Sequence, residues 1–153
     1  MTAVIVTLAD EVTEDLNKYK GQWQLSYNAE RKYAPAIELE QTDVLKVTVA
    51  MAAWRKSPDN RAEWEHEFDI EIGVQYRADV KFGDEAKAKF DDCLMLTQQI
   101  SDHYEETRPT LSDCVLTAVE FGGPTGLPYV PDHIRQFNQF TGVVTLTFGF
   151  KMR

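Results

Sequence analysis

The sequence predicts an α+β fold: a mainly antiparallel sheet of about five strands with two helices packed on one face. Two segments repeat their apolar residues every three or four positions, as amphipathic helices do. Other segments alternate apolar and polar residues, which is typical of strands with one buried face. Along the chain these segments follow as helix, three strands, helix and two strands, with no repeat or linker between them. We therefore expect one domain, residues 1–153.

The first helix is predicted over residues 4–19, with Gly21 just past its end. The second opens at Gly83-Asp84, with Asp84 as the N-cap, and ends before Pro109. Its expected inward residues are Phe90, Cys93, Leu94, Leu96, Ile100 and Tyr104. Cys93 and Cys114 lie among apolar neighbours without metal-type spacing, so we expect buried free thiols.

Strands are predicted over residues 22–34, 44–53, 63–76, 114–121 and 140–150. The polar, basic segment 54–61 contains Ser-Pro-Asp-Asn, which favours the tip of a hairpin. A breaker-rich loop is expected over 122–131.

The strand 63–76 is unusually acidic on one parity. The carboxylates on that parity are Glu63, Glu65, Glu67, Asp69 and Glu71. At about 3.3 Å per residue they stand about 7 Å apart on the exposed face, where they repel one another. Local folding does not require all of them. The face is therefore either a solubility device or a surface that must not hold a negatively charged molecule.

Composition excludes several function classes. A formal charge of −9 argues against a general nucleic-acid binder and against adsorption to an anionic membrane. The apolar runs are too short to span a bilayer, and the N-terminus lacks the basic region of a signal peptide. Hydrophobic residues make up 43% of the chain, as in ordinary globular proteins.

The sequence offers no catalytic or metal-binding pattern. His66 lies on the apolar parity of its strand, His103 is near a helix end and His133 is in a loop, so none has a ligand partner at a suitable spacing. A row of carboxylates on one strand face diverges, whereas a metal site needs converging oxygens. No phosphate-binding loop, nucleophile elbow or zinc motif is present. We expect no enzymatic activity, cofactor or metal.

The segment order resembles the tail terminator proteins of long-tailed bacteriophages, a family similar to the lambda minor tail protein that caps the tail tube. The resemblance covers most of the chain, and each motif alone is weak. It is carried by an N-terminal helix before Arg31-Lys-Tyr-Ala-Pro35, Leu45-x-Val-x-Val49, Asn60-Arg61 at the start of a long strand, Tyr129-Val-Pro131, and the strand Phe140–Phe150.

The resemblance implies a hexameric ring, assembled from monomers, that ends tube polymerisation and docks the head-completion or neck protein. DNA would pass through the ring without specific binding, and the protein would occur in the virion and, during assembly, in the host cytoplasm. A related neck or tail-completion protein, an acidic DNA mimic and a small ligand-binding domain are the alternatives.

Two hypotheses follow from the resemblance. The carboxylates of the strand 63–71 face the lumen of the ring; the alternative is a solvated outer face, partly paired with Lys46 or other basic residues of the adjacent strand. The tip 54–61 and the loop 122–136 form the assembly surfaces. Trp54 is either an inward residue at the strand end or an anchor in a partner's pocket. The candidate interface residues are Trp54, Arg55, Lys56, Arg61, Tyr129, Asp132 and Arg135.

Overall fold

A computed structural model describes residues 1–23, 25–33, 44–59, 63–78, 83–122 and 126–152. In chain order the elements are α1 (Val4–Lys18), β1 (Ala29–Lys32), β2 (Lys46–Pro58), β3 (Trp64–Arg77), α2 (Asp84–Thr107), β4 (Thr110–Leu111), β5 (Cys114–Phe121), α3 (Pro131–Phe137) and β6 (Gln139–Met152).

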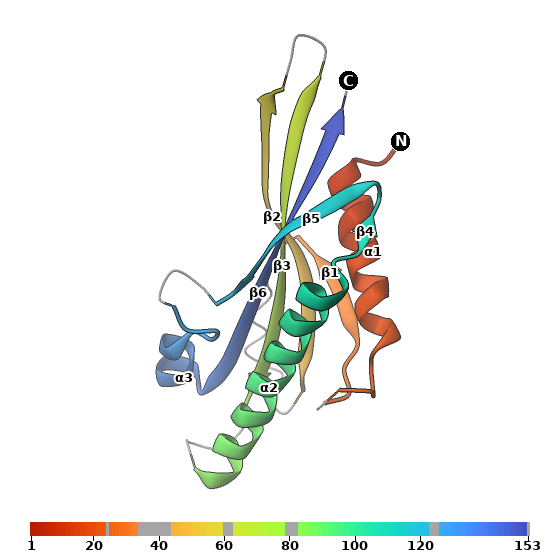
Figure 1. Cartoon of the computed structure of the whole chain (residues 1–153). Coiled ribbons are helices and arrows are strands. Elements are labelled where there is room, and N and C mark those ends of the chain that lie inside the picture. Colours follow the sequence, from red (N-terminus) through yellow and green to blue (C-terminus); the bar gives the residue numbers. More distant parts are fainter. Residues whose placement is uncertain (24, 34–43, 60–62, 79–82, 123–125, 153) are drawn as a thin grey trace.

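The described strands form one mixed sheet of six, in the order β1-β2-β3-β6-β5-β4. Only β1 and β2 run parallel; the other neighbouring strands are antiparallel. Helices α1 and α2 lie against one face of the sheet (Figure 1). The predicted α+β class is confirmed. The expectation of about five strands and two helices was wrong in detail, because β4 and α3 are additional elements.

The core lies between these two helices and the sheet. From α1 come Leu8, Val12 and Leu16, which are spaced to share one helix face and are fully buried. The central strands β3 and β6 supply fully buried residues at every second position. These residues are Phe68, Ile70, Ile72, Val74, Val144, Leu146 and Phe148.

The second helix follows its predicted pattern closely. Of its expected inward residues, Phe90, Cys93, Leu96, Ile100 and Tyr104 are buried, whereas Leu94 is only partly buried. Cys93 and Cys114 are buried free thiols, as expected. The N-cap prediction was wrong: Gly83 is the N-cap and Asp84 is the first residue of α2, where its charge favours the helix dipole.

The strand predicted over residues 22–34 is limited to Ala29–Lys32 in the described part of the chain. Its apolar alternation has another cause. Trp23 stacks on Tyr19 at 5.2 Å between ring centroids, and the Tyr27 hydroxyl donates a 2.6 Å hydrogen bond to the Leu16 carbonyl. These aromatic residues pack against the end of α1, so they do not extend β1.

Strand β2 continues well beyond its predicted end at residue 53. A bulge between Met51 and Ala53 shifts the register against β3, and pairing then continues to Pro58 opposite Trp64. Residues 54–58 are therefore strand, and the predicted tip over 54–61 was too long. Because of the bulge, Trp54 lies opposite Phe68 on the helix side of the sheet.

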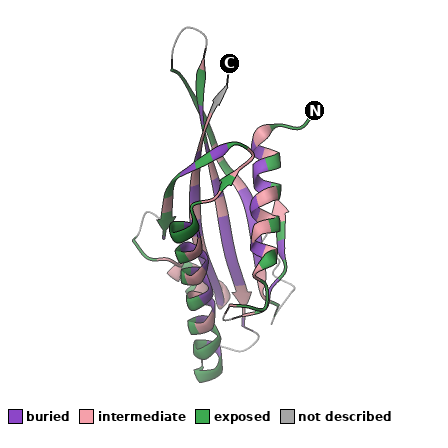
Figure 2. Ribbon diagram, turned by 45° about the vertical axis from the view of Figure 1, so that its right-hand side comes forward, coloured by how far each residue is buried: buried purple, intermediate pink, exposed green. Residues whose placement is uncertain are grey.

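The outer parts of β2, β3 and β6 project past α1 and α2 (Figures 1 and 2). We call residues 53–58, 64–69 and 147–150 the arm; Phe68 and Phe148 at its base are buried in the core. Its inner face is the one on the helix side of the sheet, and its outer face is the opposite one.

Candidate functional site: an acidic outer face and a projecting arm

The alternation predicted for the acidic strand is present in β3. His66, Phe68, Ile70 and Ile72 are buried on the inner face, whereas Glu65, Glu67, Asp69 and Glu71 lie on the outer face and are exposed or half-buried. Glu63 precedes β3, and its carbonyl accepts a 3.0 Å hydrogen bond from the Asp59 amide. The outer-face carboxylates are thus four on β3, with Glu63 directly before the strand.

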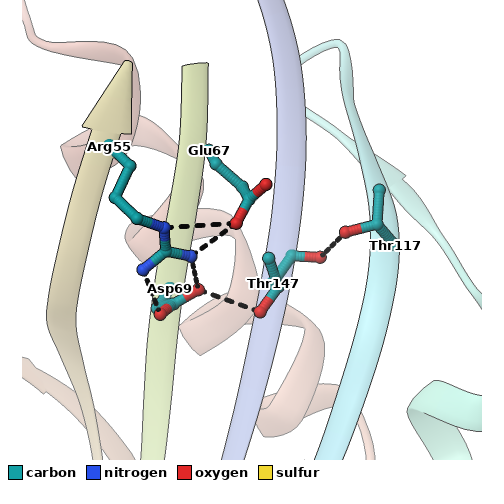
Figure 3. Close-up of polar contacts among 5 residues, drawn as sticks. All are labelled: Arg55, Glu67, Asp69, Thr117 and Thr147. Atoms are coloured by element: carbon teal, nitrogen blue, oxygen red, sulfur yellow. Dashed lines mark hydrogen bonds and ion pairs between the residues drawn. The ribbon is translucent and has the colours of Figure 1, made fainter. Parts of the chain in front are cut away.

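Arg55 pairs with the middle of this carboxylate row. It lies opposite Glu67 in the β2–β3 register, and its Nη2 donates to Glu67 Oε1 at 2.6 Å. Its Nη1 and Nη2 donate to the two oxygens of Asp69, each at 2.9 Å (Figure 3). On the other side of β3, Thr147 Oγ1 donates to Asp69 Oδ1 at 2.9 Å. One guanidinium therefore bridges two carboxylates that, judged from the sequence alone, would repel each other.

The two inner carboxylates of the row differ in electrostatic environment. The Arg55 guanidinium, helped by Thr147, lowers the pKa of Asp69 against the opposing effect of burial. Burial raises the pKa of Glu71, which makes no ion pair within the described residues. Asp69 is thus held charged, and Glu71 carries the cost of partial desolvation.

The inner face of the arm is aromatic. Trp54 Nε1 donates a 2.9 Å hydrogen bond to Nδ1 of the buried His66, and the Trp54 ring lies 5.6 Å from that of Phe68. Because Nδ1 accepts, a neutral His66 carries its proton on Nε2. Nearer the last β2–β3 pair, Pro58 and Trp64, Lys56 Nζ lies 5.6 Å from the Trp64 ring centroid. Trp54 and Trp64 remain 53% and 47% exposed, so the arm presents an aromatic inner face and an acidic outer face.

The other candidate interface residues lie elsewhere. Tyr129 forms a bridge to Gly142 and stacks on Phe140 at 5.8 Å. Asp132 and Arg135 form an ion pair within α3. This group and the arm lie at opposite ends of β6 (Figure 1), so the structure does not bring the two predicted assembly surfaces together. Arg61 lies outside the described residues.

Sequence reasoning missed a pocket on the outer face. Its volume is about 450 Å³, and it lies between the sheet and the segment 126–132. Glu71, Thr145 and Glu120 lie side by side on β3, β6 and β5 at its wall. The strand register that aligns them depends on long-range pairing, which no local pattern in the sequence encodes.

The histidines serve packing and hydrogen bonding. His66 fits its predicted core position. His103 Nε2 donates to Asp15 Oδ2 at 3.0 Å across α2 and α1, instead of facing the end of its helix. His133 Nδ1 and Thr141 Oγ1 are 2.8 Å apart. Among the described residues, no three His, Cys, Asp or Glu side chains are grouped to hold a metal ion.

Comparison with protein-family models and with curated protein sequences found no match. In the described part of the chain, no helix is long and apolar enough to cross a membrane. The functional argument therefore depends on the geometry of the acidic face and the arm.

Proposed function

We propose that this protein is a structural component of a bacteriophage tail, which forms a ring on the tail tube, ends tube polymerisation and provides a docking surface for the head or neck. The proposal is supported by the acidic character of the outer face of the sheet. One face is covered by α1 and α2, whereas the opposite face of the arm is left with a row of carboxylates.

Such a face suits a channel for DNA. A lumen that lets a duplex slide must repel phosphates, because lysines or arginines that contact them would hold the duplex through counterion release. Arg55 pairs with Glu67 and Asp69 of the row, and Glu71 makes no ion pair among the described residues, so three negative charges and this one positive charge leave the row net negative. The same pairing disfavours the DNA-mimic alternative, since two of the carboxylates already bind a guanidinium.

Neutralisation of the carboxylates in this row tests the proposal. The triple variant Glu67→Gln, Asp69→Asn, Glu71→Gln removes three negative charges and leaves Arg55 without its carboxylate partners. We expect slower DNA passage, measured as ejection kinetics from assembled particles. The matched control removes three exposed carboxylates of α2, by Glu85→Gln, Asp91→Asn and Glu105→Gln. Equal ejection rates for both variants would refute the lumen assignment.

Tube length tests the capping role directly. Particles assembled without this protein should contain tubes of uncontrolled length that carry no heads, and adding it back should restore a uniform length. If tube length is the same with and without the protein, the capping role is wrong.

A small-molecule site is the second candidate, because the outer-face pocket has Glu71 and Glu120 at its wall. Its volume lies within the range of ligand pockets, and the carboxylates would select a cationic ligand. Spermidine should then raise the melting temperature of the wild type but not that of Glu71→Gln. Equal melting temperatures with and without spermidine would exclude this ligand class.

A further inference from the structure

A groove on the outer face lies between the arm and the start of β5. Its volume is about 430 Å³, and it is lined by Glu65, Asp113, Val115, Thr117, Gly149 and Phe150. Val115 is 58% exposed although it is aliphatic, and Gly149 adds no side chain to the groove. Glu65 and Asp113 are exposed carboxylates at its edge. The groove therefore combines an exposed apolar surface with negative charge.

The inner face of the same arm has the complementary composition. Trp64 is about half exposed, and Lys56 lies over its ring. Trp54 adds a second half-exposed indole that is fixed in place by its bond to His66. Tryptophan is a common anchor at protein interfaces, because its indole buries a large area.

We propose that the inner face of the arm of one copy docks in the outer-face groove of the next copy, with Trp64 against Val115 and Lys56 against Glu65. Charge complementarity selects a second copy as the occupant: the groove needs a cation beside an apolar group, and the arm supplies both. This inference deepens the proposed ring and rests on it.

The two surfaces face opposite sides of the sheet, so one copy cannot join its own arm to its own groove. The contact is therefore heterologous, since each copy uses a different surface toward each neighbour. Contacts of this kind close into rings when the rotation between copies allows it. In such a ring Glu65 belongs to the subunit contact, and Glu67, Asp69 and Glu71 remain as the lumen-facing carboxylates.

Charge exchange between copies tests this contact. Lys56→Glu alone places two carboxylates opposite each other in every contact, and Glu65→Lys alone places two lysines there. We expect each variant to associate at least about tenfold more weakly than the wild type in sedimentation equilibrium. An equimolar mixture restores an opposite-charge pair in every contact, because each arm then meets the groove of the other variant. The mixture should therefore assemble.

The mixing result also separates loss of the contact from loss of folding, since a misfolded variant cannot be rescued by its partner. The controls Lys87→Glu and Asp91→Lys make the same charge changes on the exposed side of α2 and should associate like the wild type. A mixture that associates as weakly as its components overturns the contact. If the wild type assembles only on the tube, the same comparison is made with isolated tail tubes, and single variants that load onto tubes like the wild type overturn the contact. The tube-length assay does not depend on the association measurements, so it tests the proposed function separately from this contact.

Discussion

The hydrogen bond between Trp54 and His66 should contribute measurably to the stability of the arm. Trp54→Phe keeps an aromatic ring over Phe68 but removes the indole donor, which leaves Nδ1 of a buried histidine without its 2.9 Å partner. Leaving a buried acceptor unsatisfied costs about 1–3 kcal/mol. Because half of the indole is already exposed, the loss of apolar burial is small. We expect a loss of about 1–2 kcal/mol in the free energy of unfolding.

Urea unfolding followed by circular dichroism measures this loss without depending on tryptophan fluorescence. The matched control is Trp64→Phe, on the same face of the arm, because Trp64 contacts Lys56 through its ring and no hydrogen bond to a buried group is seen in the described residues. It should cost less than about 0.5 kcal/mol. Equal losses for the two variants, at equal denaturant slopes, would show that the hydrogen bond to His66 adds nothing.

Three further predictions concern packing and protonation. Gly142→Ala should lower the free energy of unfolding in urea by about 1–3 kcal/mol, because its Cβ would clash with Thr97 Oγ1. The control Gly149→Ala meets only Thr117 Cγ2 at 3.6 Å and should be nearly neutral. Equal losses for the two variants would contradict the packing of α2 on β6. Burial raises the pKa of Glu71, so the folded state holds this proton more tightly than the unfolded state, and stability is lost as the pH rises from about 4 through the folded-state pKa. The melting temperature of Glu71→Gln minus that of the wild type should therefore increase between pH 4 and pH 7. A difference that stays constant over this range would contradict the prediction. Burial raises the pKa of Cys93 to about 12 and that of Cys114 to about 11. Both thiols should therefore react with a disulfide reagent at pH 8 only after the protein unfolds. Rapid reaction of the native protein would show instead that the thiols are accessible.

Sequence periodicity predicted the elements whose pattern is local. The alternation of β3 and the spacing in α1 and α2 each depend on neighbouring residues, so their buried faces could be identified directly. Helix α3 had a local signal that was overlooked: Pro131 and Asp132 are a proline and an acidic residue at the start of a helix, as helix N-termini favour.

The partners on the acidic face could not be predicted in the same way. If β2 continued without its bulge after Met51, Arg55 would fall on the inner parity and Trp54 on the outer one. The extra residue between Met51 and Ala53 exchanges them, which brings Arg55 to Glu67 and Trp54 to His66. A bulge has no distinct sequence pattern, so the ion pairs and the aromatic face of the arm both follow from a feature visible only in the fold.

Native mass spectrometry, of the protein alone and of the protein released from isolated tail tubes, tests the central proposal of a ring most directly. We predict six copies in one closed assembly, either in solution or on the tube. A stable monomer that never joins a tube, and that instead binds a nuclease, would contradict the ring and support the acidic DNA mimic.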